Sequence, residues 1–321
     1  MKIATAIASL MLFILGVGTA CAQDNFPSRT VTLVVTQAPG GGMDGVARIV
    51  ARKMSALLNQ SVVVENKPGG AENIAINAVA KAAPDGYTLL LCSNSITINP
   101  SLYKSLPYDA RKELRPIGKL GASPLLLVAA ATEPYRTVPE LVAYAKANPD
   151  KLSYGSPGTG TAHHLGMELI KSATGAPIQH VPYRGAAPGV NDLLAGTIPL
   201  LVATLSPVEP HIIAGKIRPL VTINTARVRQ LDQVPSVSEV IPGLEIQSWM
   251  GMFTPAGVPD AAAAKLTDAL RSTLQDAEVV TQLDRLGFVV AWSPPTELQT
   301  TMARDEVRWA AAIRDAGIKP E

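Results

Sequence analysis

Residues 31–50 read VTLVVTQAPGGGMDGVARIV: a β-branched strand, a proline with three glycines, and then an amphipathic helix. The first turn of a helix has backbone N–H groups without intrahelical partners, and the aligned peptide dipoles add partial positive charge there. Glycines let a ligand approach those amides closely. The stretch therefore predicts a strand, turn and helix that bind an anion, and it leaves open whether that anion is a nucleotide or a carboxylate.

Residues 1–22 have the pattern of a secretory signal peptide. Lys2 precedes a largely apolar run from Ile7 to Val17, and small residues surround Cys21. Because the run is short for a membrane span and polar residues follow it, we expect cleavage after Ala22 and export to the periplasm rather than a retained anchor. Acylation of Cys21 stays open as an alternative, although Gly18 stands where a lipoprotein signal normally has a branched apolar residue.

Charge and cysteine content narrow the function further. The 28 Lys and Arg against 26 Asp and Glu give a net charge of +2, which falls to +1 once Lys2 leaves with the signal. Basic residues are scattered, so we expect no binding to nucleic acid. Without Cys21 the mature chain keeps only Cys92, which offers no internal disulfide; in the run YTLLLCS we expect it to be a buried small hydrophobe.

Strands and helices alternate along the mature chain of about 300 residues, which predicts an α/β protein with two lobes. We expect residues 23–123 and 247–321 to form lobe 1, and residues 124–246 to form lobe 2. The stretch 94–121 holds three prolines and reads as loop, and after Glu245 the chain is expected to turn to helices that return to lobe 1. After the first strand, which begins at residue 31, the predicted strands are 61–64, 87–92, 125–130, 152–155, 178–183, 198–202, 217–223 and 288–291. The predicted helices are 46–58, 73–83, 161–172, 189–195, 208–214, 260–275, 279–286 and 296–316, and a capping box at 137–140 opens one more helix.

A second glycine turn, Ser156-Pro-Gly-Thr-Gly-Thr161, leads into a helix in the other half of the chain. Two such turns, one from each lobe, are what a cleft between two α/β lobes needs to hold one anion from both sides. Hydroxyls and amides together suit a carboxylate, because ionised acceptors strengthen hydrogen bonds. The structural alternative, that both are ordinary turns of a doubly wound sheet, carries equal weight from composition alone.

An enzyme is the main alternative from the residues. Gly40 to Gly45 satisfies G-x-G-x-x-G, and Glu65 follows twenty residues later, where a dinucleotide fold places its ribose ligand. Two features argue against an NAD-dependent enzyme. Pro39 precedes the glycines, and the export signal would take the protein to a compartment where nicotinamide dinucleotides are not expected. The chain has no G-x-S-x-G elbow and no P-loop, and the adjacent His163 and His164 point about 100° apart on a helix. We therefore expect no catalytic residues, no metal and no cofactor.

The chain resembles an extracytoplasmic solute receptor of the tripartite tricarboxylate transporter family, the Bug or TctC group. The resemblance implies a two-lobed periplasmic binding protein of type II, with a mixed sheet in each lobe. It further implies a monomer that closes on a small carboxylate and delivers it to the membrane permease subunits. The matching segments cover nearly the whole mature chain in order: APGGGMDGVAR, VENKPGG, AAPDGYTLL, ITINPSLYKSLPYD, YGSPGTGTAHHLGMELIK, VPYRGAAPGVNDLLAG, PHIIAGKIRPL, SWMGMFTPAGVP and EVRWAAAIRDAGIKPE.

The resemblance also implies a set of ligand-binding residues. In lobe 1 these are Gln37, Pro39, Gly40, Gly41, Asp44, Ser93, Asn94 and Ser95, and in lobe 2 they are Ser156, Thr159, Gly160, Thr161, His164, Tyr183, Arg184, Gly185 and Thr204. Three of them have a structural alternative: Asp44 could complement its helix N-terminus, His164 could fix the loop, and Arg184 could pair with a structural carboxylate.

Two departures from the family pattern bear on the ligand. Gln37 stands where relatives usually carry an aromatic residue, and Ala203-Thr204 stand where many have Asp-Asn. Without an acid at that point, we expect a dicarboxylate, tricarboxylate or aromatic carboxylate rather than an amino acid. Trp249 lies nearest the expected hinge. A ligand-presenting sensor for a signalling receptor would use the same cleft and stays open as an alternative to transport.

Overall fold

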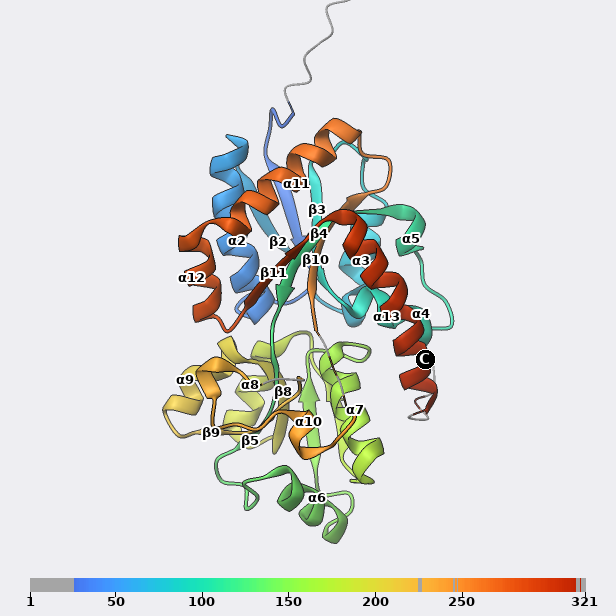
Figure 1. The fold of residues 1–321 in the computed structure, drawn as a ribbon. Helices are drawn as coiled ribbons and strands as arrows, with labels where there is room; N and C mark the ends of the chain where they lie inside the picture. Colours follow the sequence, from blue (N-terminus) through green and yellow to red (C-terminus); the bar gives the residue numbers. More distant parts are fainter. Residues whose placement is uncertain (1–25, 225–226, 245, 247, 316–317, 319–321) are drawn as a thin grey trace, which may run out of the picture.

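Two α/β lobes lie one above the other in the computed structural model, which describes residues 26–224, 227–244, 246, 248–315 and 318 (Figure 1). The predicted two-lobed α/β fold is therefore confirmed. The predicted signal peptide and Cys21 lie outside the described residues. Within those residues, no helix has the length and apolar character that a membrane crossing requires.

Lobe 1 is built on a six-stranded sheet in the order β11-β4-β10-β3-β1-β2. Its strands are β1 (Val31–Val35), β2 (Val62–Asn66), β3 (Thr88–Ser93), β4 (Leu114–Ala122), β10 (Met250–Pro255) and β11 (Val289–Ser293). Its helices are α2 (Gly42–Leu58), the short η1 (Gly70–Glu72), α3 (Asn73–Ala80), α4 (Ser95–Leu102), α5 (Ala110–Glu113), α11 (Asp260–Gln275), α12 (Ala277–Arg285) and α13 (Pro295–Asp315).

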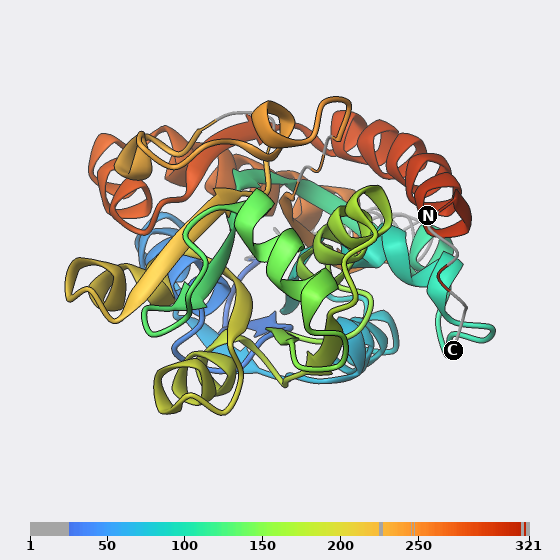
Figure 2. The same ribbon diagram turned by 90° about the horizontal axis from the view of Figure 1, so that it is seen from below.

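Lobe 2 is built on a five-stranded sheet in the order β7-β6-β8-β5-β9. Its strands are β5 (Leu125–Ala130), β6 (Ser153–Ser156), β7 (Gln179–Pro182), β8 (Leu200–Thr204) and β9 (Ile217–Thr222). Its helices are α6 (Val138–Ala147), α7 (Ala162–Thr174), α8 (Ala186–Ala195), α9 (Leu205–Ile213), η2 (Arg229–Leu231) and α10 (Val237–Val240). Figure 2 shows this lobe from below, with the helices of both lobes around the two sheets.

The same strand arrangement occurs in both lobes. In lobe 1 the parallel strands β2, β1 and β3 lie side by side, and β10 pairs antiparallel with β3. In lobe 2 the parallel strands β7, β6 and β8 lie side by side, and β5 pairs antiparallel with β8. Parallel strands end at one edge of a sheet, and ligands of open α/β sheets bind beyond that edge. Each lobe therefore gathers its strand-to-helix turns at one edge.

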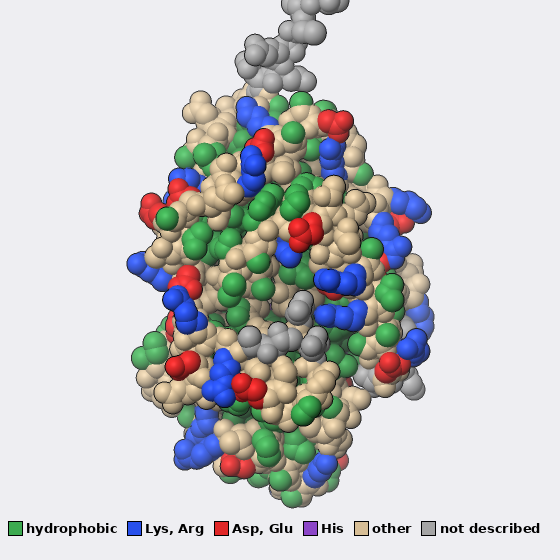
Figure 3. Space-filling view, in the orientation of Figure 1, with side chains coloured by type: hydrophobic (Ala, Val, Ile, Leu, Met, Phe, Trp, Pro, Cys, Tyr) green, Lys and Arg blue, Asp and Glu red, His purple; other side chains and the backbone are tan. Residues whose placement is uncertain are grey.

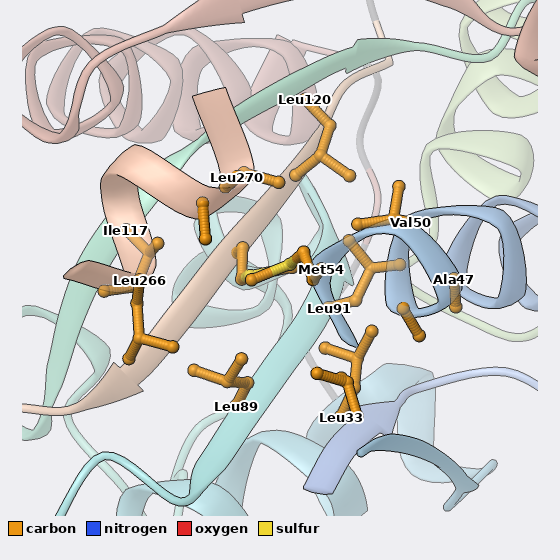
Figure 4. Packing of buried hydrophobic residues seen from close by; sticks show 14 of the residues in the cluster. Leu33, Ala47, Val50, Met54, Leu89, Leu91, Ile117, Leu120, Leu266 and Leu270 are labelled. Carbon is orange, nitrogen blue, oxygen red and sulfur yellow. The ribbon is translucent and has the colours of Figure 1, made fainter. Parts of the chain in front are cut away.

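Helices cover both faces of the first sheet, with one apolar cluster on each face. Figure 4 shows part of the first of these clusters. Leu33 and Leu91 lie in the first core with Val50 and Met54 of α2, and all four are fully buried or nearly so. The helix α2 begins at Gly42 and not at the predicted residue 46. Met43 in its first turn is fully buried as well, so the face of α2 that packs on the sheet extends to the start of the helix. Burial of each such side chain contributes about 1.5–3 kcal/mol, so this packing holds the turn at the beginning of α2 in place.

The region predicted as loop, residues 94–121, contains two helices and a long strand, so that prediction was wrong. The strand β4 carries Pro116, which lacks an N–H for a ladder hydrogen bond. The strand persists because β10 and β11 pair with it on both sides, with irregular register near the proline. Prolines signalled a loop, but tertiary pairing decided the structure.

The strand β10 was not predicted either, although it pairs with β3 and β4 in the middle of the first sheet. Its sequence MGMFTP contains a glycine and ends in a proline, which hides the strand pattern. Trp249, just before it, is buried and donates its indole N–H to Asp305 of α13 at 2.7 Å. This contact fixes Trp249 inside lobe 1.

Helix α13 links the lobes at one side. It begins on lobe 1, and its end reaches the level of α7 (Figure 1). Trp309 and Ile313 of α13 are buried in the apolar cluster of lobe 2, where Leu165 of α7 also lies. The chain crosses between the lobes before β5 and before β10, and this helix adds an apolar contact between them. On the other side, Gln230 of lobe 2 donates its side-chain amide to the carbonyl of Asp284 in lobe 1 at 2.7 Å.

Charged side chains are spread with both signs over the face in Figure 3. This distribution agrees with the near-neutral net charge of the sequence. Cys92 is fully buried in β3, as expected, and burial holds the pKa of its thiol well above the ordinary value. The thiol is therefore unreactive at neutral pH.

Candidate functional site

A cavity of about 360 Å³ lies between the two lobes, at the strand-to-helix turns. This volume falls within the range of small-molecule sites. From lobe 1 it is lined by Thr36, Gln37, Pro68, Gly69, Gly70, Ala71, Glu72, Ile74 and Tyr103, and from lobe 2 by Pro157, Gly158, Thr159, Thr161, Pro182, Tyr183, Arg184 and Gly185. A molecule in this cavity would contact both lobes.

The first wall is the turn between β2 and α3. Four consecutive residues have positive φ: Gly69 (117°), Gly70 (55°), Ala71 (50°) and Glu72 (76°). The last two are not glycines, so this backbone is strained by about 1–3 kcal/mol per residue and must be held by its surroundings. Asn99 of α4 holds it by donating its side-chain amide to the carbonyl of Ala71 at 2.8 Å.

Glu72 is the last residue of this wall, and its side chain is almost completely buried. Its carboxylate accepts the backbone N–H of Ser93 at 2.9 Å and the Ser93 hydroxyl at 2.7 Å. The side-chain amide of Gln37 lies at 3.5 Å. Burial raises the pKa of Glu72, although these hydrogen bonds act in the opposite direction.

The second wall is the glycine turn between β6 and α7. The Ser156 hydroxyl accepts the N–H of Gly158, and Nδ1 of His164 accepts the N–H of Gly160, both at 3.2 Å. Thr161 caps α7 by accepting the N–H of His164. Thr159 faces the cavity, and neither its hydroxyl nor its N–H makes a hydrogen bond within the described part of the chain. The turn is rigid, and Thr159 remains available to a ligand.

The third wall is the loop after β7, which carries Arg184 and Gly185. Tyr183 is fixed by a 2.7 Å hydrogen bond from its hydroxyl to Asp192 of α8. Arg184 is exposed and lines the cavity, and its guanidinium makes no hydrogen bond or ion pair within the residues that the structure describes. The structural alternative for Arg184, an ion pair with a structural carboxylate, is thus not observed. A free guanidinium beside Thr159 suits an anionic group.

Two histidines, His164 and His180, support the second wall from behind. The ring of His180 stacks on that of His164 at 4.2 Å and bonds the Ser156 hydroxyl at 2.7 Å. His163, the residue before His164, is buried as well. Burial lowers the pKa of His163 and His164 to about 4 and that of His180 to about 3, so all three rings are neutral at pH 7.

Acidification should therefore destabilise the ligand-free protein. Histidines of the unfolded chain have pKa values near 6.5, so below that pH the unfolded chain binds more protons than the native protein. We expect the melting temperature to fall by several degrees between pH 7 and pH 5. The raised pKa of Glu72 has the opposite effect, because the native protein binds this proton more tightly than the unfolded chain does. It offsets only one of the three protons that the histidines of the unfolded chain take up. His163→Met should remove about a third of the decrease, and a melting temperature that is unchanged or higher at pH 5 would contradict this explanation.

Several glycines lie against the opposite lobe, and three of them show how closely the lobes approach near the cavity. A methyl group added at Gly42 would lie 2.4 Å from Oγ1 of Thr204, and one at Gly185 would lie 3.0 Å from Cβ of Ala38. The third contact brings Gly160 of lobe 2 against lobe 1, where an added methyl would lie 3.3 Å from Cβ of Ala71. Side chains at these glycines would separate the lobes. The structure therefore corresponds to a closed arrangement.

The glycine turn at residues 40–42 does not line the cavity. Asp44 occupies it instead: its carboxylate accepts the N–H of Gly40 at 3.1 Å and the side-chain amide of Asn66 at 3.0 Å, and it pairs with Arg48. Burial opposes ionisation of Asp44, but these contacts outweigh it and lower the pKa. The carboxylate of Asp44 thus lies at the turn where the sequence predicted that a bound anion would lie.

The predicted binding residues divide into two sets. Those that line the cavity are Gln37, Thr159, Thr161, Tyr183, Arg184 and Gly185. Those that lie outside its lining are Pro39, Gly40, Gly41, Asp44, Ser93, Asn94, Ser95, Ser156, Gly160, His164 and Thr204. Ser93 and Ser156 support lining residues, whereas Gly160 and Thr204 lie where the lobes touch. For the residues that line the cavity, ligand contact remains a prediction.

Sequence reasoning missed the wall from Pro68 to Glu72. The signal was present, because Pro68-Gly69-Gly70 follows a strand and precedes a helix in the same way as the two turns that were selected. Thr36, Ile74, Tyr103, Pro157, Gly158 and Pro182 were not named as site residues either. No group of three or more potential metal ligands is found among the described residues.

Two similar lobes that enclose a cavity, with lining residues from both, define a two-lobed solute-binding protein. The sequence matches the tripartite tricarboxylate transporter family receptor (TctC) over residues 46–318, so the chain belongs to this family. Members of this family are periplasmic binding proteins and not enzymes.

Solved structures of relatives agree with this assignment. The periplasmic binding protein BugD has a TM-score of 0.89 and 33% identity, covering 92% of this chain and 100% of its own. An R. palustris protein solved with adipate has the same values. MatC from Rhodopseudomonas palustris, solved with malate, has a TM-score of 0.84 and 29% identity, covering 90% of this chain and 100% of its own. TctC receptors bind small carboxylates for tripartite tricarboxylate transport.

Proposed function

We propose that this protein captures a small carboxylate between its lobes and delivers it to the membrane permease of a tripartite tricarboxylate transporter. The observation that carries the proposal is the pair of unpartnered groups in one cavity, the Arg184 guanidinium and Thr159. Relatives solved with adipate and malate support the ligand class. The sequence of residues 1–22 supports export to the periplasm, where such a receptor works.

Capture proceeds by hinge closure. An open form exposes the turns of both lobes, and a ligand that contacts both favours the closed form. The shift in population is limited by the difference in the ligand's affinity for the two forms. The close contacts at Gly42, Gly160 and Gly185 limit how closely the lobes approach around the cavity. The permease would then recognise the closed surface.

A thermal-shift screen of residues 23–321 tests the proposal. The panel contains dicarboxylates, tricarboxylates, aromatic carboxylates, amino acids and NAD. A ligand that binds only the native state raises the melting temperature, by an amount that grows with its concentration. We expect carboxylates to raise it and NAD not to. A shift with NAD alone, or none with any carboxylate after refolding to remove co-purified ligand, would contradict the proposal.

Gly42→Ala should lower ligand affinity several-fold while leaving the fold at least as stable. Ala is favoured over Gly in a helix by up to about 1 kcal/mol, but its methyl group would overlap the Thr204 hydroxyl only in the closed form. Titration calorimetry and thermal melting measure the two effects. The same substitution is then made in a Thr204→Ala protein, which lacks the hydroxyl. There, Gly42→Ala should lower the affinity by less than it does in the unmodified protein. Unchanged affinity of Gly42→Ala would show that this contact is absent from the ligand-bound form.

A further inference from the structure

Two ionisable residues line the cavity, one from each lobe. Among the described lining residues only Glu72 and Arg184 are acidic or basic. Arg184 belongs to the loop after β7 in lobe 2, and Glu72 to the turn between β2 and α3 in lobe 1. The closed cavity therefore has an acidic side chain from one lobe and a basic side chain from the other.

Glu72 has hydrogen-bond donors but no positive partner. Ser93 supplies two donors, at 2.9 and 2.7 Å, and Gln37 a distant third at 3.5 Å. Within the described residues, no lysine, arginine or histidine forms an ion pair with Glu72. The side-chain hydroxyl of Thr36 is a further donor. All of these donors are neutral groups, so they satisfy the carboxylate oxygens of Glu72 but do not balance a negative charge on them. Buried carboxylates are normally paired, because an isolated charge in a protein interior is costly.

The backbone places this acid at the cavity despite strain. Ala71 and Glu72 both have left-handed backbone angles, which are unfavourable for residues with a Cβ atom. Such outliers persist where the surroundings hold them, and they are concentrated at binding sites. Here Asn99 holds the carbonyl of Ala71, and Ser93 holds the carboxylate of Glu72. The position of Glu72 is fixed before a ligand arrives.

We propose that the ligand carries a positively charged nitrogen as well as a carboxylate, and that Glu72 binds this nitrogen while Arg184 and Thr159 bind the carboxylate. The inference rests on the proposed function, since it assigns the second end of the same ligand. It revises the expectation from Ala203-Thr204: the acid that recognises an amino group comes from lobe 1 instead. The cavity volume of about 360 Å³ lies within the range of small-molecule sites, so it can hold a ligand with both groups.

Pairs of ligands that differ by one amino group test the inference in the unmodified protein. Aspartate with succinate, glutamate with glutarate, and 4-aminobutyrate with butyrate are compared by titration calorimetry on residues 23–321. We expect the amino member to bind at least tenfold more tightly in one or more pairs, which is about 1.4 kcal/mol. If no amino member binds more tightly than its counterpart, the inference is wrong. Tight binding of the partners without nitrogen would then leave the proposed function intact, and no binding at all would remove both.

Glu72→Gln isolates the residue. This variant keeps the side-chain length but removes the charge, so the preference for the amino ligand should fall tenfold or more, and succinate or glutarate should gain affinity. Glu65→Gln is the matched control, because Glu65 ends outside the cavity beside Lys67 and should change neither affinity. An unchanged amino preference in a folded Glu72→Gln protein would overturn the assignment. If the variant does not fold, the comparison of ligand pairs in the unmodified protein still decides.

Discussion

Arg184→Gln is expected to lower the affinity for every carboxylate ligand by about 10- to 100-fold. Arg184 has no ion-pair partner within the described chain, and it lines the cavity beside Thr159. Hydrogen bonds to charged groups contribute about 1.5–3 kcal/mol each, which corresponds to this range. Titration calorimetry measures the loss. It should be the same for amino and non-amino carboxylates, whereas Glu72→Gln discriminates between them.

Arg136→Gln is the matched control for this prediction. Arg136 is an exposed arginine of the same lobe, before α6, and it does not line the cavity. Its replacement removes one positive charge from lobe 2 without touching the site. If both variants lose the same small amount of affinity, Arg184 acts only through the net charge. Full affinity in Arg184→Gln would remove Arg184 from the site.

Gly160→Ala is expected to lower ligand affinity by about tenfold or more, beyond any loss of stability. An added methyl would lie 3.0 Å from Oδ1 of Asn99 and 3.1 Å from Cδ1 of Leu102, as well as close to Ala71. All three neighbours belong to lobe 1, so the lobes cannot close fully. Titration calorimetry gives the affinity and thermal melting gives the stability.

Gly40→Ala is the control, because its backbone strain matches that of Gly160→Ala. Gly40 has φ of 80° and Gly160 of 84°, so an alanine at either position costs about 1–2 kcal/mol of stability. An added methyl at Gly40 would meet nothing within 4 Å. We therefore expect both variants to melt at lower temperature, and only Gly160→Ala to bind weakly. Equal loss of affinity in the two variants would mean that strain, and not closure, is responsible.

Much of the fold could be predicted from the sequence because local patterns and tertiary structure agree in most elements. The helix α11 has the predicted bounds, and Gly175 ends α7 in the left-handed conformation expected of a helix-terminating glycine. The failures lie where pairing partners are distant in sequence. β4 and β10 pair with each other across more than 100 residues, and their prolines and glycines hide the strand pattern.

The site was predictable only in part, for a related reason. The strand–glycine–helix rule finds turns, but it does not say which turn is filled by the protein's own atoms. Asp44 fills the turn at Gly40, and only the folded structure brings Asn66 and Arg48 to stabilise it there. Glu72 was overlooked because its role depends on its burial beside Ser93, which the sequence alone does not reveal.

The most direct test of the central claim is a crystal structure of residues 23–321 with the tightest-binding carboxylate of the screen. We predict electron density for the ligand in the cavity between the lobes, with one carboxylate within about 3 Å of the Arg184 guanidinium and of Thr159. Density for the ligand elsewhere, at the turn of Gly40 or on the outer surface of a lobe, would contradict the account.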